Sequence, residues 1–171
     1  FKVTSASTPK RAQHPSVLAV GRQEPQKGYT ELLEVFDRLA DHVPDVHLVV
    51  AGREGNDTSR LQATHRAMRH GGRVHLLGQR SDVPELLATA EVVVCCSKRE
   101  GAAGALIETM AAGVPVVTVE LDGLEGVVVD DLNGLVVPRD QLGAGLERVL
   151  GDATLAARLG ASGREFYEEH Y

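Results

Sequence analysis

Two segments of the 171-residue chain combine charged side chains with glycines in a pattern that suits a small anionic ligand. The first is residues 21–28 (GRQEPQKG), in which Arg22 and Lys27 stand five positions apart between two glycines. A guanidinium can grip phosphate oxygens in a bidentate fork, and an ammonium can act as a point charge beside it. The amides at the start of a following helix would add to the attraction. The alternative interpretation is a solvated loop with ordinary surface charges.

The second segment, residues 97–113 (SKREGAAGALIETMAAG), carries the glutamates Glu100 and Glu108 eight positions apart. Glu108 falls within a predicted helix of small and apolar residues, where a buried carboxylate needs hydrogen-bond donors. The vicinal hydroxyls of a sugar are suitable donors, since a carboxylate can accept from both at once. The alternative is that Glu108 lies on an exposed stripe of a surface helix.

Apolar runs and amphipathic segments alternate along the chain. The runs predict strands at residues 17–21, 46–51, 73–77, 92–96, 115–119 and 135–137. Helical spacing predicts helices at residues 28–43, 57–70, 82–90, 103–112, 140–150 and 153–170. The runs show no alternation, which is typical of strands covered on both faces. The pattern predicts an α/β fold, a Rossmann-like doubly wound parallel sheet in a single domain. Ligands of such sheets bind at the carboxyl ends of the strands, so we expect the two segments to converge on one crevice.

Composition narrows the class of partner. Eighteen basic residues against 24 acidic ones give a net charge of −6. This balance argues against a domain built for long runs of nucleic-acid phosphates or for an anionic lipid surface. No apolar run approaches the roughly 20 residues that span a bilayer. Residues 1–15, rich in Ser, Thr, Pro and Lys, predict a linker from a missing upstream domain, and residues 16–171 predict one domain.

The cysteines and histidines suggest no metal site. Cys95 and Cys96 are neighbours on a predicted strand and point to opposite faces, so a bridge between them would be strained. They are interpreted as small buried side chains in a reducing cytoplasm. The seven histidines lack the spacing of a helical metal pair, so we assign them no role and expect no metal.

Three stretches in this order resemble a known family: GRQEPQKG, SKREGAAGALIETMAAGVPVV and DGLEGVVVDDLNGLVVP. They are similar to the C-terminal domain of the retaining glycosyltransferases of family 4, which have the GT-B fold. The resemblance covers nearly the whole chain from about Val17 to the end, where residues 164–171 resemble the start of the family's C-terminal crossover helix, which crosses back to the other domain. In that family the C-terminal domain binds the nucleotide-sugar donor, and an N-terminal Rossmann-like domain binds most of the acceptor.

The resemblance implies an activity and its partners. The activity is metal-independent transfer of a sugar from a nucleoside-diphosphate sugar to an acceptor hydroxyl, with retention and without a cofactor. UDP is favoured over GDP as the donor nucleotide, because it is the commonest in the family. The implied partner is the N-terminal acceptor-binding domain of the same polypeptide, and nucleic acid is not a partner. The implied location is cytoplasmic, and contact of the full-length protein with the inner face of the cell membrane stays open.

Carried over residue by residue, the family pattern places Arg22 and Lys27 on the donor pyrophosphate. There they would neutralise the charge that grows on the departing diphosphate. Glu108 would accept hydrogen bonds from the ribose hydroxyls. Glu100 would face the donor sugar, so the expected catalytic residues are Glu100, Arg22 and Lys27.

Two further groups are implied by the same pattern. Backbone amides of Ala103, Gly104 and Ala105 would contact the phosphates or the sugar. Gln79 and Arg80, in the loop after the third predicted strand, would lie beside the nucleobase. For these two side chains a solvated loop is an equally good interpretation.

The chain departs from the family pattern at two places. Many members have Phe-Gly or Gly-Gly where this chain has Ala102-Ala103-Gly104, and the methyl group of Ala103 narrows the room for a donor sugar. Many also have a glutamate where this chain has Gly126, with Glu125 one position early. Neither change touches the expected phosphate and ribose contacts.

Two other functions stay open at this stage. One is a non-catalytic nucleotide-sugar binding module that regulates or scaffolds a larger protein, and the other is a GT-B nucleotide-sugar 2-epimerase. In every case we expect this chain alone to bind donor without turnover, because the acceptor half of the cleft would be missing. The nucleobase, the sugar, the acceptor and the oligomeric state do not follow from the sequence.

Overall fold

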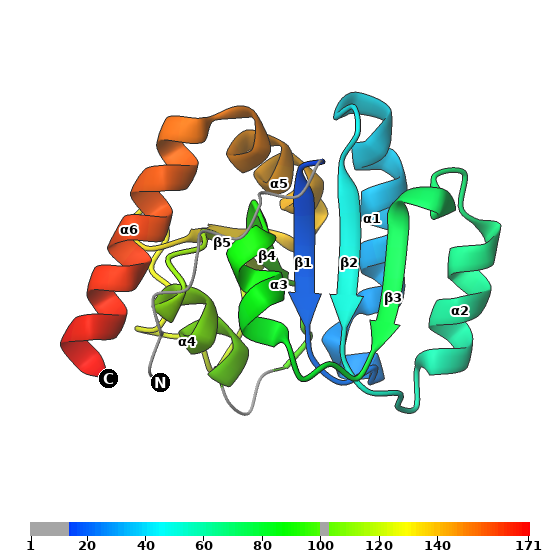
Figure 1. Ribbon diagram of the computed structural model, residues 1–171, viewed down its shortest axis with the longest axis horizontal. Helices are drawn as coiled ribbons and strands as arrows, with labels where there is room; N and C mark the ends of the chain where they lie inside the picture. Colours follow the sequence, from blue (N-terminus) through cyan, green and yellow to red (C-terminus); the bar gives the residue numbers. More distant parts are fainter. Residues whose placement is uncertain (1–13, 100–102) are drawn as a thin grey trace.

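The computed structural model describes residues 14–99 and 103–171, which form a layered α/β domain (Figure 1). One parallel sheet of six strands has the order β3-β2-β1-β4-β5-β6. Its strands are β1 (Ser16–Val20), β2 (His47–Ala51), β3 (Val74–Gly78), β4 (Val92–Cys95), β5 (Val116–Val119) and β6 (Leu135–Val137). The described helices are α1 (Tyr29–His42), α2 (Thr58–Ala67), α3 (Val83–Thr89), α4 (Gly104–Ala111), α5 (Leu142–Gly151) and α6 (Ala153–His170). The predicted doubly wound parallel sheet is confirmed.

Alternate residues of the central strands pack on opposite faces of the sheet. Val17 and Ala19 of β1 belong to the core shared with α1 and α5, whereas Leu18 packs with α3 on the other face. Figure 1 shows α3 and α4 in front of the sheet and α1 behind it. Because β1, β4 and β5 are covered on both sides, their sequences are continuous apolar runs.

Helix α1 illustrates why the local sequence folds as it does. Leu32, Leu33, Phe36 and Leu39 recur at helical spacing and are all buried against the sheet. The helix begins after Gly28, whose φ of 71° is in the left-handed region, and it ends at His42 before Val43-Pro44. The first residues of α1 therefore lie at the carboxyl end of β1.

One expectation about the strands is wrong. Strand β3 is an edge strand, and its residues alternate between buried and accessible rather than being covered on both faces. His75 and Leu77 of β3 are exposed, with 36% of Leu77 accessible to solvent. The predicted helix at residues 57–70 is also shorter, because it ends at Ala67 and a short 3-10 helix covers Gly71–Arg73.

Helix α6 joins the two faces of the sheet. Leu155 and Leu159 near its start pack in the α1–α5 core, whereas Phe166 and Tyr167 near its end pack beside α4. Helix α6 lies close to the segment that follows α4 because residue 160 is glycine. A methyl group at Gly160 would collide with the carbonyl oxygen of Gly113. Among the described residues, no helix has the length and apolar character needed to cross a membrane.

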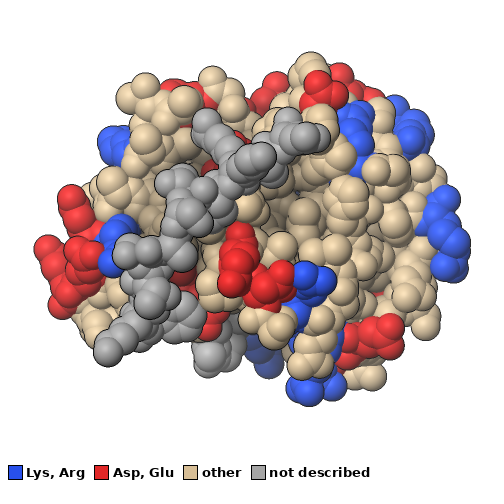
Figure 2. All heavy atoms as spheres, viewed as in Figure 1, with Lys and Arg blue, Asp and Glu red and all other residues tan. Residues whose placement is uncertain are grey.

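The surface on the α3–α4 side carries charges of both signs. Figure 2 shows acidic side chains gathered over α6 at the left edge and basic ones over α2 at the right edge. The described part of this face is therefore not one broad basic field of the kind that binds nucleic acid.

Candidate functional site

A pocket of about 250 Å³ opens at the carboxyl ends of β1 and β4. This is the edge of the sheet where parallel α/β domains bind their ligands. Its walls come from the β1–α1 loop, from the end of β4 and from the start of α4. They include Gly21, Arg22, Lys27, Cys96, Ser97, Ala103, Gly104, Ala105 and Leu106.

The structure brings five of the predicted site residues to this pocket. Arg22 and Lys27 line one wall, and Ala103, Gly104 and Ala105 at the start of α4 line the other. The first amides of a helix have no acceptor inside the helix, and the helix dipole makes this end positive. Two cations and a helix N-terminus therefore line the same volume, an arrangement that attracts an anion.

Other predicted residues lie elsewhere. Glu108 is exposed on α4, as in the alternative interpretation of a surface helix, so it is not the buried carboxylate on which the sequence argument relied. It borders a separate groove of about 300 Å³ between α3, α4 and α6, together with Leu87 and Tyr167. Gln79 is exposed and does not line the pocket at the ends of β1 and β4. Glu100 lies outside the described residues, as does Ala102. The roles predicted for these residues stay predictions.

Arg80 also lies outside the pocket lining. Its guanidinium makes two hydrogen bonds with Asp82, from Nε to Oδ1 (2.7 Å) and from Nη2 to Oδ2 (2.6 Å). These bonds lower the pKa of the Asp82 carboxyl below its ordinary value. Arg80 is therefore engaged within its own loop.

Arg22 is held by a carboxylate in its own loop. Its Nε lies 2.9 Å from Oε1 of Glu24; the Arg22 side chain is 51% exposed and that of Glu24 only 10%. The other carboxylate oxygen of Glu24 accepts a hydrogen bond from the amide of Asn56 (3.3 Å). The guanidinium thus reaches the pocket from a buried anchor.

Residues 52–58, which we call the support loop, hold the β1–α1 loop in place through hydrogen bonds. The side chain of Gln23 is buried, donates to the carbonyl of Gly52 (3.1 Å) and accepts from the hydroxyl of Thr58 (2.8 Å). The hydroxyl of Thr30 in α1 donates to the buried carboxylate of Asp57 (2.9 Å). These bonds fix the pocket wall that carries Arg22.

The end of β4 is fixed by a residue that the sequence did not single out. Arg139 donates from Nη1 to the carbonyl of Cys96 (2.8 Å) and from Nη2 to the carbonyl of Ser97 (2.7 Å). Arg139 lies in the short 3-10 helix Arg139–Gln141 after β6, 42 and 43 positions from its acceptors. A sequence pattern gives no signal for a contact this distant.

Both cysteines are buried free thiols, as predicted. The thiol of Cys96 donates to the carbonyl of Lys27 (3.1 Å). Burial raises the pKa of Cys96 to about 12, with the neighbouring Cys95 adding to the effect. Cys96 is therefore a neutral packing residue behind the pocket wall.

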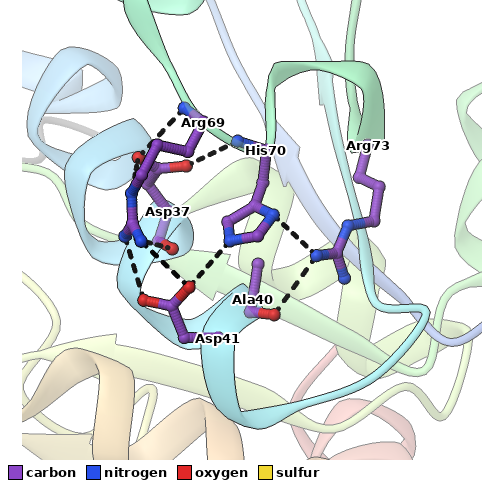
Figure 3. A network of polar contacts seen from close by, with 6 residues as sticks. All are labelled: Asp37, Ala40, Asp41, Arg69, His70 and Arg73. Carbon is purple, nitrogen blue, oxygen red and sulfur yellow. Dashed lines mark hydrogen bonds and ion pairs between the residues drawn. The ribbon is translucent and has the colours of Figure 1, made fainter.

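The histidines do have structural roles that the sequence interpretation missed. His70 lies in the polar network of Figure 3, in which Arg73 Nη2 donates to His70 Nδ1 (2.8 Å). The other ring nitrogen, Nε2, therefore carries the proton and donates to Asp41 (2.8 Å). Asp41 also accepts two bonds from Arg69. The network ties the end of α1 to the segment between α2 and β3.

A second histidine group lies on the sheet near its β3 edge. The rings of His14, His47 and His75 stack in a row, and His47 Nδ1 lies 2.8 Å from His75 Nε2. Burial, followed by the neighbouring charges of His75 and His14, lowers the pKa of His47. Within the two described ranges, no group of three or more His, Cys, Asp or Glu side chains could hold a metal ion.

The structure also describes Gly126 and Glu125, where the sequence departs from the expected family pattern. Gly126 has a φ of 80°, a conformation that glycine adopts easily. The carboxylate of Glu125 accepts a hydrogen bond from the amide of Gly123 (2.8 Å) and is thus engaged within its own turn.

Comparison with known proteins shows which family the sequence matches. The sequence profile described as "Glycosyl transferases group 1" matches residues 2–166. A phosphatidyl-myo-inositol mannosyltransferase of Mycolicibacterium smegmatis is 35% identical over 149 residues, which are 83% of this chain and 38% of the relative. The chain thus spans less than half the length of this relative.

Two solved structures share the fold. The C-terminal domain of a glycosyl transferase group 1 family protein (LpcC) from Francisella tularensis superposes with a TM-score of 0.82 at 22% identity, covering 92% of this chain and 86% of that domain. Anabaena Alr3699/HepE, solved in complex with UDP-glucose, gives a TM-score of 0.85 at 22% identity over 94% of this chain and 45% of its own. At this level of identity the likeness concerns the fold alone.

Proposed function

The chain belongs to the group 1 glycosyl transferases, and from this premise we propose that it is the donor-binding half of a retaining, metal-independent glycosyltransferase. The proposed reaction transfers a sugar from a nucleoside-diphosphate sugar to an acceptor hydroxyl. An N-terminal acceptor-binding domain of the same polypeptide would complete the active site.

One observation carries the proposal: Arg22, Lys27 and the start of α4 line a single pocket at the carboxyl end of the sheet. A departing nucleoside diphosphate gains negative charge as its bond to the sugar breaks. Positive groups fixed before the reaction stabilise this charge without having to reorganise. Arg22 would bind two oxygens through its planar fork, and Lys27 would act as a point charge.

The placement of Glu108 is compatible with a role toward the ribose. It follows Gly104 by four residues on α4, which corresponds to about 6 Å along the helix axis. A nucleotide whose diphosphate sits at the start of α4 could extend along the helix and bring its ribose hydroxyls to this carboxylate. The Alr3699/HepE structures contain UDP-glucose and UDP, which supports UDP as the first nucleotide to test.

A non-catalytic nucleotide-sugar binding module is the second candidate. It is favoured by the turn at residues 122–126, where this chain has Gly126 at the position at which the family resemblance implies a glutamate, and where Glu125 is engaged with Gly123. A chain of this kind would bind donor through the same pocket, and the completed protein would show no transfer.

Thermal unfolding with UDP, GDP and ADP tests the proposal. A ligand at about 100 times its Kd stabilises a protein by about 2.7 kcal/mol. For a domain of this size the expected rise in Tm is roughly 5–10 °C. We expect Arg22→Ala or Lys27→Ala to remove most of the rise, and Arg66→Ala, an exposed residue of α2, to leave it intact. Equal rises in the wild type and in both pocket variants would refute the phosphate assignment.

A further inference from the structure

We propose that Glu24 is a positioning residue that orients the Arg22 guanidinium toward the diphosphate of the donor. This inference rests on the proposed function, which places the diphosphate at Arg22. By its charge alone, a buried carboxylate directly beside an anion-binding cation would weaken anion binding.

The contact between the two side chains selects which donors of Arg22 face a ligand. Oε1 of Glu24 lies 2.9 Å from Nε of Arg22. A guanidinium is planar and rigid, so occupying Nε fixes the plane and direction of the whole group. Nη1 and Nη2 then form the edge that a phosphate can engage with two parallel hydrogen bonds.

Glu24 can act as an anchor because it is itself fixed at several points. Its amide donates to the carbonyl of Arg22 (2.8 Å), and its carbonyl accepts from the amide of Lys27 (2.9 Å). Glu24 is therefore part of the turn that joins the two proposed phosphate-binding cations. Its second carboxylate oxygen accepts from the Asn56 amide in the support loop (3.3 Å).

Gly55 of the support loop lies close against the Glu24 carboxylate. A methyl group at Gly55 would lie 2.7 Å from Oε1 of Glu24 and 2.5 Å from the carbonyl oxygen of Gln23. The Glu24 side chain is only 10% exposed, whereas that of Arg22 is 51% exposed. The pair thus has a fixed, buried end and an accessible end that lines the pocket.

Positioning and simple electrostatics predict opposite signs for the loss of Glu24. If the carboxylate only repels the diphosphate, its removal raises the affinity for UDP, because like charges in proximity repel. If the carboxylate orients Arg22, its removal releases the guanidinium into many rotamers and lowers the affinity. The sign of the change therefore decides between the two.

The experiment measures the Kd of this chain for UDP by calorimetry, with thermal-shift titration for weak binders. We expect Glu24→Ala to raise the Kd by about three- to tenfold, as for residues that interact within one charged network. Glu24→Gln keeps the side-chain length but weakens the charge-assisted bond, so its Kd should rise by a smaller factor. Glu54→Ala removes the same charge from an exposed position of the support loop and should leave the Kd within about twofold.

A double-mutant cycle separates positioning from a general loosening of the loop. In an Arg22→Ala background, Glu24→Ala should no longer change the Kd, because the group that it orients is gone. An unchanged or lower Kd in Glu24→Ala and Glu24→Gln overturns the proposal. A loss of affinity that is equally large in the Arg22→Ala background overturns it as well. If Arg22→Ala itself leaves the Kd unchanged, the diphosphate assignment fails first, and the two failures are distinguishable.

Discussion

Gly28 lies directly against the carbonyl group of Cys96, so that a Cβ atom at Gly28 would stand 2.5 Å from the carbonyl oxygen. The two residues belong to the β1–α1 loop and to the end of β4, the segments that form adjoining walls of the pocket. The Cys96 thiol donates a hydrogen bond to the carbonyl of Lys27, the residue before Gly28. The absence of a side chain at Gly28 therefore sets the distance between the two walls.

Replacement of Gly28 by alanine should separate these walls and destabilise the chain. The residue has a φ of 71°, which is costly for alanine, and the added methyl group meets backbone that cannot move aside easily. We expect a loss of about 2–4 kcal/mol in the free energy of unfolding, from the backbone strain and the overpacking together. Urea denaturation measures it, and UDP binding should weaken in parallel.

Gly72→Ala is the matched control for this variant. Gly72 has no atom within 4 Å of an added Cβ and is not among the residues with positive φ. Its replacement should change the free energy of unfolding by less than about 1 kcal/mol. Equal effects of the two substitutions would show that the Gly28–Cys96 approach does not limit the structure.

Arg139 provides a second test, of the segment at the end of β4 that lines the pocket. Arg139→Ala leaves the carbonyls of Cys96 and Ser97 without their charged donor, and we expect a loss of about 1–3 kcal/mol in the free energy of unfolding. Arg139→Lys keeps the charge but not the fork, so it should recover only part of the loss. Arg148→Ala serves as the control. The Arg148 side chain is exposed and makes a long ion pair of 3.9 Å with Asp131, so its removal should change the free energy of unfolding little. A lysine variant as stable as the wild type would mean that charge alone suffices.

The sequence predicts the layers of this fold better than it predicts the contacts inside the site. Continuous apolar runs mark β1, β4 and β5 correctly because both faces of these strands are covered. The exposure of one face of β3 depends on its place at the edge of the sheet, and strand order is not written in the local pattern.

The candidate site shows the same division. Arg22 and Lys27 are recognisable because two cations and two glycines stand close together in the sequence. The support of Gln23 by Thr58 and the binding of Arg139 to Cys96 join residues that are 35 and 43 positions apart. Such contacts arise only when the sheet brings neighbouring strands together, so a single sequence contains no pattern that reveals them.

The polar network of Figure 3 predicts how the chain responds to acid. Hydrogen bonds from His70 and Arg69 lower the pKa of Asp41 from its ordinary value of 3.8 to about 2. The unfolded chain therefore binds a proton at this carboxyl before the folded chain does. The stability contributed by ionised Asp41 is present above about pH 4 and is lost as the pH falls toward 2.

Asp41→Asn should therefore be less stable than the wild type at pH 7 and approach it near pH 2. Urea denaturation at pH 7, 4 and 2.5 measures the difference between the two proteins. Asp140→Asn, at an exposed position before α5, is the control and should run parallel to the wild type. A constant difference between Asp41→Asn and the wild type over this range would contradict the assigned pKa.

The contact between His47 of β2 and His75 of β3 makes stability depend on pH in a separate, higher range. Burial and the adjacent His75 lower the pKa of His47 below its ordinary value of 6.5, so the unfolded chain takes up this proton first. The stability that neutral His47 contributes is therefore fully present above about pH 6.5. It is lost as the pH falls through the lower pKa of His47 in the folded state. A neutral His47 also keeps the 2.8 Å contact with His75, in which one ring must accept.

His47→Gln should flatten the dependence of the unfolding free energy on pH between 7.5 and 5, as measured by urea denaturation. His42→Gln, at an exposed position in the last turn of α1, should retain the slope of the wild type. Identical slopes in all three proteins would show that the His47 proton does not contribute, and the Asp41 window below pH 4 would be unaffected by this result.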